Sequence, residues 1–295
     1  MPAASQLCKP RTMSQSLSLS KAPLTPGLYI VPTPLGNLRD ITLRALDVLS
    51  SVERVYCEDT RVTAKLLRHY GITAALSRYD DHAGESQRGD ILAHAETHAI
   101  ALVSDAGTPL INDPGFKLAR EAIAAGLTVT ALPGPSAPLL ALTLSGLATD
   151  QFSFFGYLPS KAGARQAFCT KLARLEHTLI VFESVHRIAA GLAALADAMP
   201  DRPAAVCREM TKLYEEVDHG TLAVLAERWA ARAAKGEFVI VIGPAQKPQV
   251  DPTLQLKEAL ADGLSVREAA KLVAKETGAS RSTLYEEALA LAGKR

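Results

Sequence analysis

The first half of the chain alternates short apolar runs with segments of helical period, and this order limits the fold more than any other feature. The apolar runs have the length of buried strands, and the segments between them carry apolar residues three or four positions apart. A helix that joins two strands of one sheet makes a right-handed crossover, which leaves the strands parallel. Residues 27–148 are therefore predicted to form an α/β domain with strands at 28–32, 54–59, 74–79, 99–105 and 127–132.

Turn and capping residues set the ends of the predicted helices. After the fourth strand, Asp113 is expected to cap a helix with Pro114 at its first position and Gly126 just past its end. Asp59 likewise directly precedes a helix that is predicted to begin at Thr60, so capping of that helix is enough to explain this carboxylate.

The second half repeats the alternation and then changes character. Residues 149–244 are predicted to form a second α/β domain, and the Pro-rich stretch 245–253 is predicted to be a linker. In residues 254–295 two helix patterns flank Gly278, and Ser265 begins a capping box. This helix–turn–helix fits nucleic-acid binding and a plain helical appendage equally well. The strands of the second domain are expected at 152–158, 178–184, 204–210 and 237–243.

Composition narrows the class of protein. The formal net charge is +1, so a nucleic-acid site would have to be local. The four cysteines form no CxxC pair and indicate reduced thiols in a cytoplasmic protein. Residues 1–26 lack a continuous apolar stretch, so a disordered tail is expected there and not a signal peptide. No apolar run approaches the roughly 20 residues that span a bilayer.

Several common ligand-binding motifs do not occur in the sequence. The loop after the first strand is PTPLGNLRD, with Gly36 alone, and not the GxGxxG of dinucleotide-binding folds. GxxxxGK[ST] and HExxH are missing, and the seven histidines show no spacing typical of metal ligands, so no metal site is predicted. GPSAP, at 134–138, has a proline where a nucleophile elbow needs its second glycine. A P-loop enzyme, a Rossmann dehydrogenase and a hydrolase are therefore not supported.

Four loops at the predicted carboxyl ends of the strands are rich in glycine, proline and polar residues. They cover 32–40, 58–61, 104–115 and 133–138. Ligands of open α/β sheets bind at this edge, and loops of this kind offer main-chain N–H and C=O groups more than side chains. An ordinary turn would explain any one loop alone, but the four together predict a ligand crevice.

Seven motifs, spread over the chain from residue 27 to about 290, resemble one family. In sequence order they are VPTPLGNLRDITLRAL, CEDTRVTAKLL, LVSDAGTPLINDPG, LPGPSA, FFGYLP, VFESVHRI and REMTKLYEEVDHGTL. Together they closely resemble the small-subunit ribosomal RNA (cytidine-2′-O)-methyltransferases, which belong to the tetrapyrrole methylase superfamily. PTPLGNLRD, SDAGTP and ESVHR make the resemblance specific, whereas PGPSA alone would be weak.

The resemblance implies two α/β domains of tetrapyrrole methylase type with S-adenosylmethionine in the cleft between them, followed by a small helix–turn–helix-like domain. It also implies that the enzyme methylates the ribose 2′-hydroxyl of a cytidine in 16S ribosomal RNA, as free RNA or in the small ribosomal subunit. A homodimer without membrane attachment is expected. Gly107 would allow close approach of the backbone or a positive φ. The residues expected to bind the cofactor are Pro34, Asp105, Ala106, Gly107, Thr108, Ile111, Ser136, Ala137, Phe182, Met210 and Glu237.

The implied reaction requires alignment of the hydroxyl with the methyl group and permits a general base. The candidates for the base are Glu58, Asp59 and His186. The residues expected to bind RNA phosphates are Arg39, Arg61 and Arg187. Asp59 could be a helix cap only, and His186 could pack locally, so the base stays unassigned at this point.

Two other classes of protein stay open on the residues alone. A methylase of porphyrin-like small molecules would usually carry a Gly-rich first loop and would not need ESVHR or the C-terminal helices. A helix–turn–helix regulator would use the α/β body only to sense a small molecule.

Overall fold

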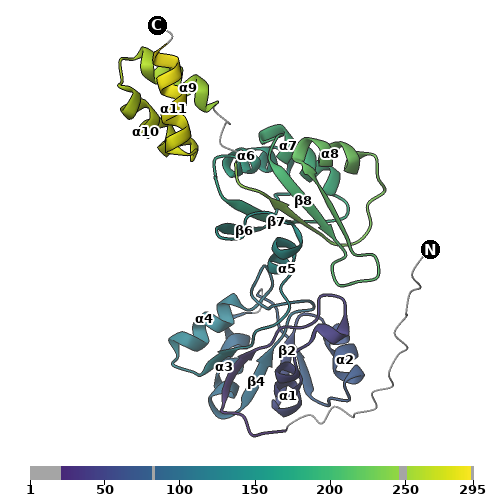
Figure 1. Cartoon of the computed structure of the whole chain (residues 1–295). Coiled ribbons are helices and arrows are strands. Elements are labelled where there is room, and N and C mark those ends of the chain that lie inside the picture. The colour runs from purple at the N-terminus through teal and green to yellow at the C-terminus, as the bar shows by residue number, and fades with distance from the viewer. Residues whose placement is uncertain (1–20, 82–83, 246–250, 294–295) are drawn as a thin grey trace, which may run out of the picture. The chain divides into compact units, whose positions relative to one another are not determined.

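The computed structural model describes residues 21–81, 84–245 and 251–293. The chain divides into two units, Met1–Pro244 and Ala245–Arg295. The first unit contains two sheets, each with its own helices, and the described part of the second is helical (Figure 1). Most of the expected tail and of the expected linker lies outside the described residues. Among the described helices, none combines the length and apolar character needed to cross a membrane.

The first sheet is parallel throughout, as the alternation of strands and helices predicts. Its order is β3-β2-β4-β1-β5. Helices α1 and α2 cover one face, and α3 and α4 cover the other (Figure 1). Strands β1 and β4 are buried along their whole length, which is why their sequences are continuous apolar runs. The bounds are β1 Gly27–Ile30, η1 Leu38–Asp40, α1 Leu43–Ser51, β2 Arg54–Cys57, α2 Thr60–His69, β3 Ala75–Arg78, α3 Glu85–Thr97, β4 Ala99–Leu102, α4 Phe116–Ala124 and β5 Val129–Ala131.

The direction of the crossovers reverses between β1 and β4. Helix α1 carries the chain from β1 past β4 to β2, and α4 carries it from β4 past β1 to β5. The two helices lie on opposite faces of the sheet, so the chain that leaves β1 and the chain that leaves β4 turn toward opposite faces. A reversal of this kind leaves a crevice at the carboxyl ends of the strands, which is where open α/β sheets bind ligands.

The second sheet is mixed, with the order β6-β7-β10-β8-β9. Strands β6 and β7 are parallel, and the remaining neighbours are antiparallel. Helices α6, α7 and α8 cover one face, whereas α5, which follows the last strand of the first sheet, packs against the other. The bounds are α5 Ala137–Leu144, β6 Phe152–Tyr157, α6 Ala162–Leu172, β7 Thr178–Glu183, α7 Ile188–Ala198, β8 Pro203–Arg208, β9 Glu216–Thr221, α8 Leu222–Ala230 and β10 Phe238–Ile242.

The C-terminal unit contains α9 Pro252–Ala261, α10 Val266–Thr277 and α11 Arg281–Ala292. The capping box predicted at Ser265 is present, and Gly278 ends α10 in the left-handed region, at φ 72°. The sequence pattern showed two helices here, but α9 begins inside the range that was expected to be linker. Buried side chains of all three helices form one core, so α9 is an integral part of this unit.

The structure corrects the predicted start of the helix after β4. Helix α4 begins at Phe116, and its N-cap is Gly115, whose φ is 126°. Asp113 therefore lies in the loop before the helix and does not cap it, and Pro114 is not a helical residue. Helix α5 and strand β9 were not expected from the sequence.

Candidate active site

The loops that follow β1, β4 and β5 are hydrogen-bonded to one another. Thr33 and Gly107 exchange two main-chain hydrogen bonds, of 2.9 and 3.0 Å, which form an isolated antiparallel bridge. The Thr33 hydroxyl donates to the carbonyl of Ser104 at 3.0 Å, and the Thr108 hydroxyl donates to the carbonyl of Pro135 at 2.7 Å. The three loops therefore hold one another as a single wall.

This wall borders a cavity of about 390 Å³, a volume within the range of small-molecule sites. The opposite wall comes from the ends of β6, β7 and β10 in the second sheet and from residues beside β7, β8 and β10. The lining residues are Leu35, Asp105, Ala106, Gly107, Thr108, Ile111, Asp113, Ser136, Ala137, Pro138, Tyr157, Phe182, Glu183, Ser184, Val185, Met210, Gly236, Glu237, Phe238 and Val239.

Unfavourable backbone conformations gather in the two walls. In the described part of the chain, the non-glycine residues with positive φ are Leu110, Asn112, Glu209 and Thr211. The first two flank the lining residue Ile111 and the other two flank Met210. Such conformations cost free energy and persist only where the surrounding structure imposes them, which occurs most often at functional sites.

Gly107 has the positive φ that its place in SDAGTP suggested, at 80°. A Cβ atom built on this residue would lie 2.9 Å from Cδ2 of Leu35, which also lines the cavity. A larger residue at this position would therefore strain the backbone and displace the Leu35 side chain.

The charged residues that line the cavity are all acidic, namely Asp105, Asp113, Glu183 and Glu237. Glu183 is buried and pairs with Arg187 at 2.9 Å, and Glu237 pairs with Lys212 at the same distance. Asp105 accepts a hydrogen bond from the main-chain N–H of Asp59. A cavity with this excess of carboxylates favours a ligand that carries positive charge.

Asp113 is a lining carboxyl group whose pKa lies well above that of an ordinary aspartate. Burial raises the pKa of Asp113 to about 6, and the nearby charges of Glu58 and Asp105 act in the same direction. A carboxylate with such a pKa can accept a proton at neutral pH better than an ordinary aspartate can. Because its predicted role was that of a helix cap, its place in the cavity was missed, although the turn-rich sequence around it was the available signal.

All but one of the residues predicted to bind the cofactor line the cavity. The exception is Pro34, whose neighbour Leu35 lines it instead. Phe182 and Met210 contribute apolar surface, and Phe182 packs edge-to-face against Tyr157 with ring centroids 5.5 Å apart. Tyr157 and Glu183 also line the cavity and were not predicted. They are the ends of strands β6 and β7, so the general rule about strand ends could have found them.

The three residues of the CEDTR motif that were predicted to act on RNA, Glu58, Asp59 and Arg61, do not line the cavity. Asp59 caps α2 by accepting the N–H of Arg61 at 2.8 Å, and its carboxylate also pairs with the Arg61 guanidinium at 2.6 Å. These hydrogen bonds lower the pKa of Asp59 well below its usual range, which makes this carboxylate a poor proton acceptor. The Arg61 side chain is 86% exposed, and Glu58 is also exposed.

The two residues taken from ESVHR differ in how tightly they are held. His186 is exposed and does not line the cavity, whereas Ser184 and Val185 beside it do. The Arg187 guanidinium pairs with Glu183 and donates to the hydroxyl of Ser184 and the carbonyl of Leu158. These contacts tie the ends of β6 and β7 together.

Arg39 lies outside the cavity as well. It is exposed in the short helix η1 of the loop after β1.

The fold and the shared cavity define a class, that of methylases built from a parallel α/β domain and a second mixed α/β domain. The model of the Tetrapyrrole (Corrin/Porphyrin) Methylases matches residues 27–226, and the chain belongs to this family. The model of the RsmI C-terminal HTH domain matches residues 248–292. The protein is thus a methyltransferase, and S-adenosylmethionine is its methyl donor.

Curated relatives match nearly the whole chain. A protein of Mesorhizobium japonicum named ribosomal RNA small subunit methyltransferase I is 46% identical over 91% of this chain and 93% of its own length. A protein of the same name from Erythrobacter litoralis is 48% identical over 92% of this chain and 98% of its own length. Among solved structures, uroporphyrin-III C-methyl transferase from Thermus thermophilus, complexed with S-adenyl homocysteine, has a TM-score of 0.53. It is 22% identical and covers 74% of this chain and 97% of that one, a likeness that concerns the fold.

The residues of the cavity fit this donor. Its sulfonium is a cation, which the excess of carboxylates favours, and its adenine ring can pack against Phe182 and Met210. The glycine at position 107 brings main-chain groups to the surface of the cavity, where a bound donor can contact them.

Proposed function

We propose that the protein methylates the ribose 2′-hydroxyl of a cytidine in 16S ribosomal RNA. The observation that carries this proposal is the 46–48% sequence identity to relatives named ribosomal RNA small subunit methyltransferase I, which extends over both units of the chain. An RNA substrate also explains why a methylase body is followed by a helix–turn–helix unit. Such a substrate would place the enzyme in the cytoplasm, with the ribosomal subunits.

When bound, S-adenosylmethionine supplies a methyl group attached to a positively charged sulfur. The walls of the cavity would fix its position, with Gly107 and Thr108 on one side and Met210 on the other. Alignment of the hydroxyl oxygen behind the methyl carbon can supply about 7–11 kcal/mol of the barrier. The C–O bond forms as the C–S bond breaks, and the hydroxyl proton must leave.

Asp113 is our proposed acceptor of this proton. It lies in the cavity wall, and its pKa of about 6 leaves it ionised but basic at neutral pH. Asp59, by contrast, is occupied by Arg61 and is a weak base. A general base typically contributes about 10²–10⁴-fold to the rate.

The RNA would approach over exposed residues near the rim of the cavity. Leu213 and Tyr214 are large and exposed, and they follow Met210 on the connection from β8 to β9. Proteins that recognise unpaired RNA commonly stack bases on such aromatic side chains. Arg39, in η1, and Arg61, in the first turn of α2, are exposed and can bind phosphates.

The test offers the enzyme labelled S-adenosylmethionine with three acceptors: small ribosomal subunits, protein-free 16S RNA and a tetrapyrrole. Label in either RNA sample, with none in the tetrapyrrole, supports the proposal and identifies the preferred form of the substrate. Label in the tetrapyrrole alone would overturn it. A Tyr214→Ala variant, matched with Ile123→Ala at an exposed position of α4, tests the rim: only the first should raise the RNA concentration needed for half-maximal rate.

A further inference from the structure

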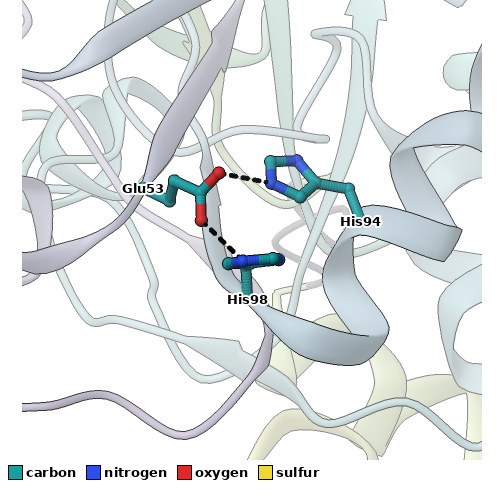
Figure 2. Close-up of side chains that lie close together, drawn as sticks. All are labelled: Glu53, His94 and His98. Atoms are coloured by element: carbon teal, nitrogen blue, oxygen red, sulfur yellow. Dashed lines mark hydrogen bonds and ion pairs between the residues drawn. The ribbon is translucent and has the colours of Figure 1, made fainter.

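Three side chains, of which Glu53 is distant in the sequence from His94 and His98, converge at the edge of the first sheet opposite the cavity. Glu53 immediately precedes β2, His98 immediately precedes β4, and His94 lies one turn earlier on α3. Strands β2 and β4 are parallel neighbours, with Arg54 beside Ile100, so the residues before them are brought together. Figure 2 shows both histidine rings directed toward the Glu53 carboxylate.

The three side chains present their ligand atoms to a common point. Nε2 of His94 lies 3.0 Å from one oxygen of Glu53, and Nε2 of His98 lies 3.0 Å from the other. All three ligand atoms lie within 4.8 Å of one another. A tetrahedral zinc site, with bonds of about 2.0–2.1 Å, holds its ligand atoms about 3.4 Å apart. Small rotations of these side chains are therefore enough to enclose an ion.

The second nitrogen of each ring has its own oxygen partner. Nδ1 of His98 lies 2.8 Å from the hydroxyl of Thr97, and Nδ1 of His94 lies 3.4 Å from the hydroxyl of Tyr56. Metal-binding histidines commonly donate Nδ1–H to an oxygen in this way, which leaves the Nε2 lone pair free for the ion. The main chain of Glu53 is fixed as well, because its N–H donates to the carbonyl of Ala99 at 3.0 Å.

We propose that Glu53, His94 and His98 bind a divalent transition-metal ion, of which zinc is the best match. Two imidazole nitrogens and one carboxylate oxygen are the ligand set of many zinc sites, whereas magnesium and calcium prefer oxygen alone. Glu53 and His98 are each close to half exposed, so an ion can enter, and water completes the coordination. No metal site was predicted from the sequence, and the proposal differs from that prediction because His94 and His98 are one helical turn apart.

The proposed ion has a structural role, since the site is at the amino ends of the strands and the cavity is at their carboxyl ends. It would join the C-terminal end of α3 to the start of β2. An ion that binds the folded chain and not the unfolded one raises the stability of the fold. Methyl transfer is not expected to need it.

The test uses the full chain without an affinity tag, freed of metal with a chelator and then titrated with zinc chloride in a calorimeter. One zinc ion per chain is expected, with a rise in the melting temperature. Glu53→Gln and His98→Gln should each weaken binding at least tenfold and abolish the rise. His219→Ala, which removes an exposed histidine on β9, is the matched control and should behave as the wild type.

Cobalt gives a second measurement that does not depend on stability. The cobalt form of the wild type should show the strong visible absorption of a low-coordinate site, and the Glu53→Gln form should lose it. Circular dichroism establishes that the variants are folded. If the wild type binds no zinc at micromolar concentrations, or if both substitutions leave binding unchanged, the three residues form only an ion-paired cluster and the proposal is wrong.

Discussion

Replacement of Asp113 by Asn removes the ionisable group whose pKa the cavity raises. Folding raises this pKa from 3.8 to about 6, so the folded state holds the proton more tightly than the unfolded chain. The stabilisation of the folded state by this tighter proton binding is fully present below pH 3.8 and is lost as the pH rises through 6. A shift of about two units corresponds to about 3 kcal/mol, and about 1.4 kcal/mol of this is lost between pH 5 and pH 8.

The Asn variant lacks this dependence, so its stability relative to the wild type should increase by about 1.4 kcal/mol from pH 5 to pH 8. Urea unfolding followed by circular dichroism at both pH values measures the difference. Contacts that the substitution alters equally at both pH values cancel. Asp201→Asn, at an exposed position outside the cavity, is the control and should show little change.

The same variant tests catalysis. The wild-type rate of methyl transfer should fall as the pH drops through about 6, because Asp113 becomes protonated. The rate of the Asn variant should not show this fall at low pH and should be about 10²–10⁴-fold lower than that of the wild type, with donor binding preserved. A stability difference that does not depend on pH would refute the raised pKa, and a normal rate would refute the proposed role.

The remaining predictions concern the donor, the loop after β2, the C-terminal unit and the oligomeric state. Gly107→Val should abolish binding of S-adenosylmethionine in a calorimeter while the protein stays folded, whereas Gly89→Ala, in α3 with open space around it, should bind normally. Asp59→Asn should turn over near the wild-type rate, and a loss of tenfold or more would make Asp59 the base after all. Arg61→Ala should raise the KM for RNA and leave donor affinity unchanged in the same assays. A chain that ends at Pro244 should bind the donor but methylate ribosomal substrate poorly; equal turnover would make the C-terminal unit an appendage. Light scattering at micromolar concentration should give the mass of a homodimer, and a monomer would contradict that expectation.

The elements that the sequence predicted well are those in which local signals and burial agree. Strands β1 and β4 are covered on both faces, so continuous apolar runs marked them. Strand β9 has no fully buried residue in EVDHGT and lies at the sheet edge, which gave it no apolar run to detect. Helix α5 is apolar around much of its surface and follows a turn-rich loop, so its period was not apparent.

In the candidate site, too, the residues with a local sequence signal were predicted, and those that depend on the tertiary fold were not. Gly and Pro at strand ends indicated the loops of the cavity, because turn residues are a local signal. Asp113 was assigned to a cap on the strength of Pro114, but a glycine at φ 126° starts the helix two residues later. The cluster of Glu53 with His94 and His98 could not be inferred from spacing alone, since the pairing of β2 with β4 brings Glu53 to the two histidines.

The central claim is that this chain transfers a methyl group to a ribose hydroxyl of 16S RNA, and mass spectrometry of the nucleosides tests it most directly. RNA from small subunits would be treated with enzyme and donor, digested completely to nucleosides and compared with RNA treated with the Gly107→Val variant. A gain of 2′-O-methylcytidine, close to one per RNA molecule and missing with the variant, is the predicted result. Methyl groups on the base of a nucleoside, or no gain over the variant, would contradict the claim.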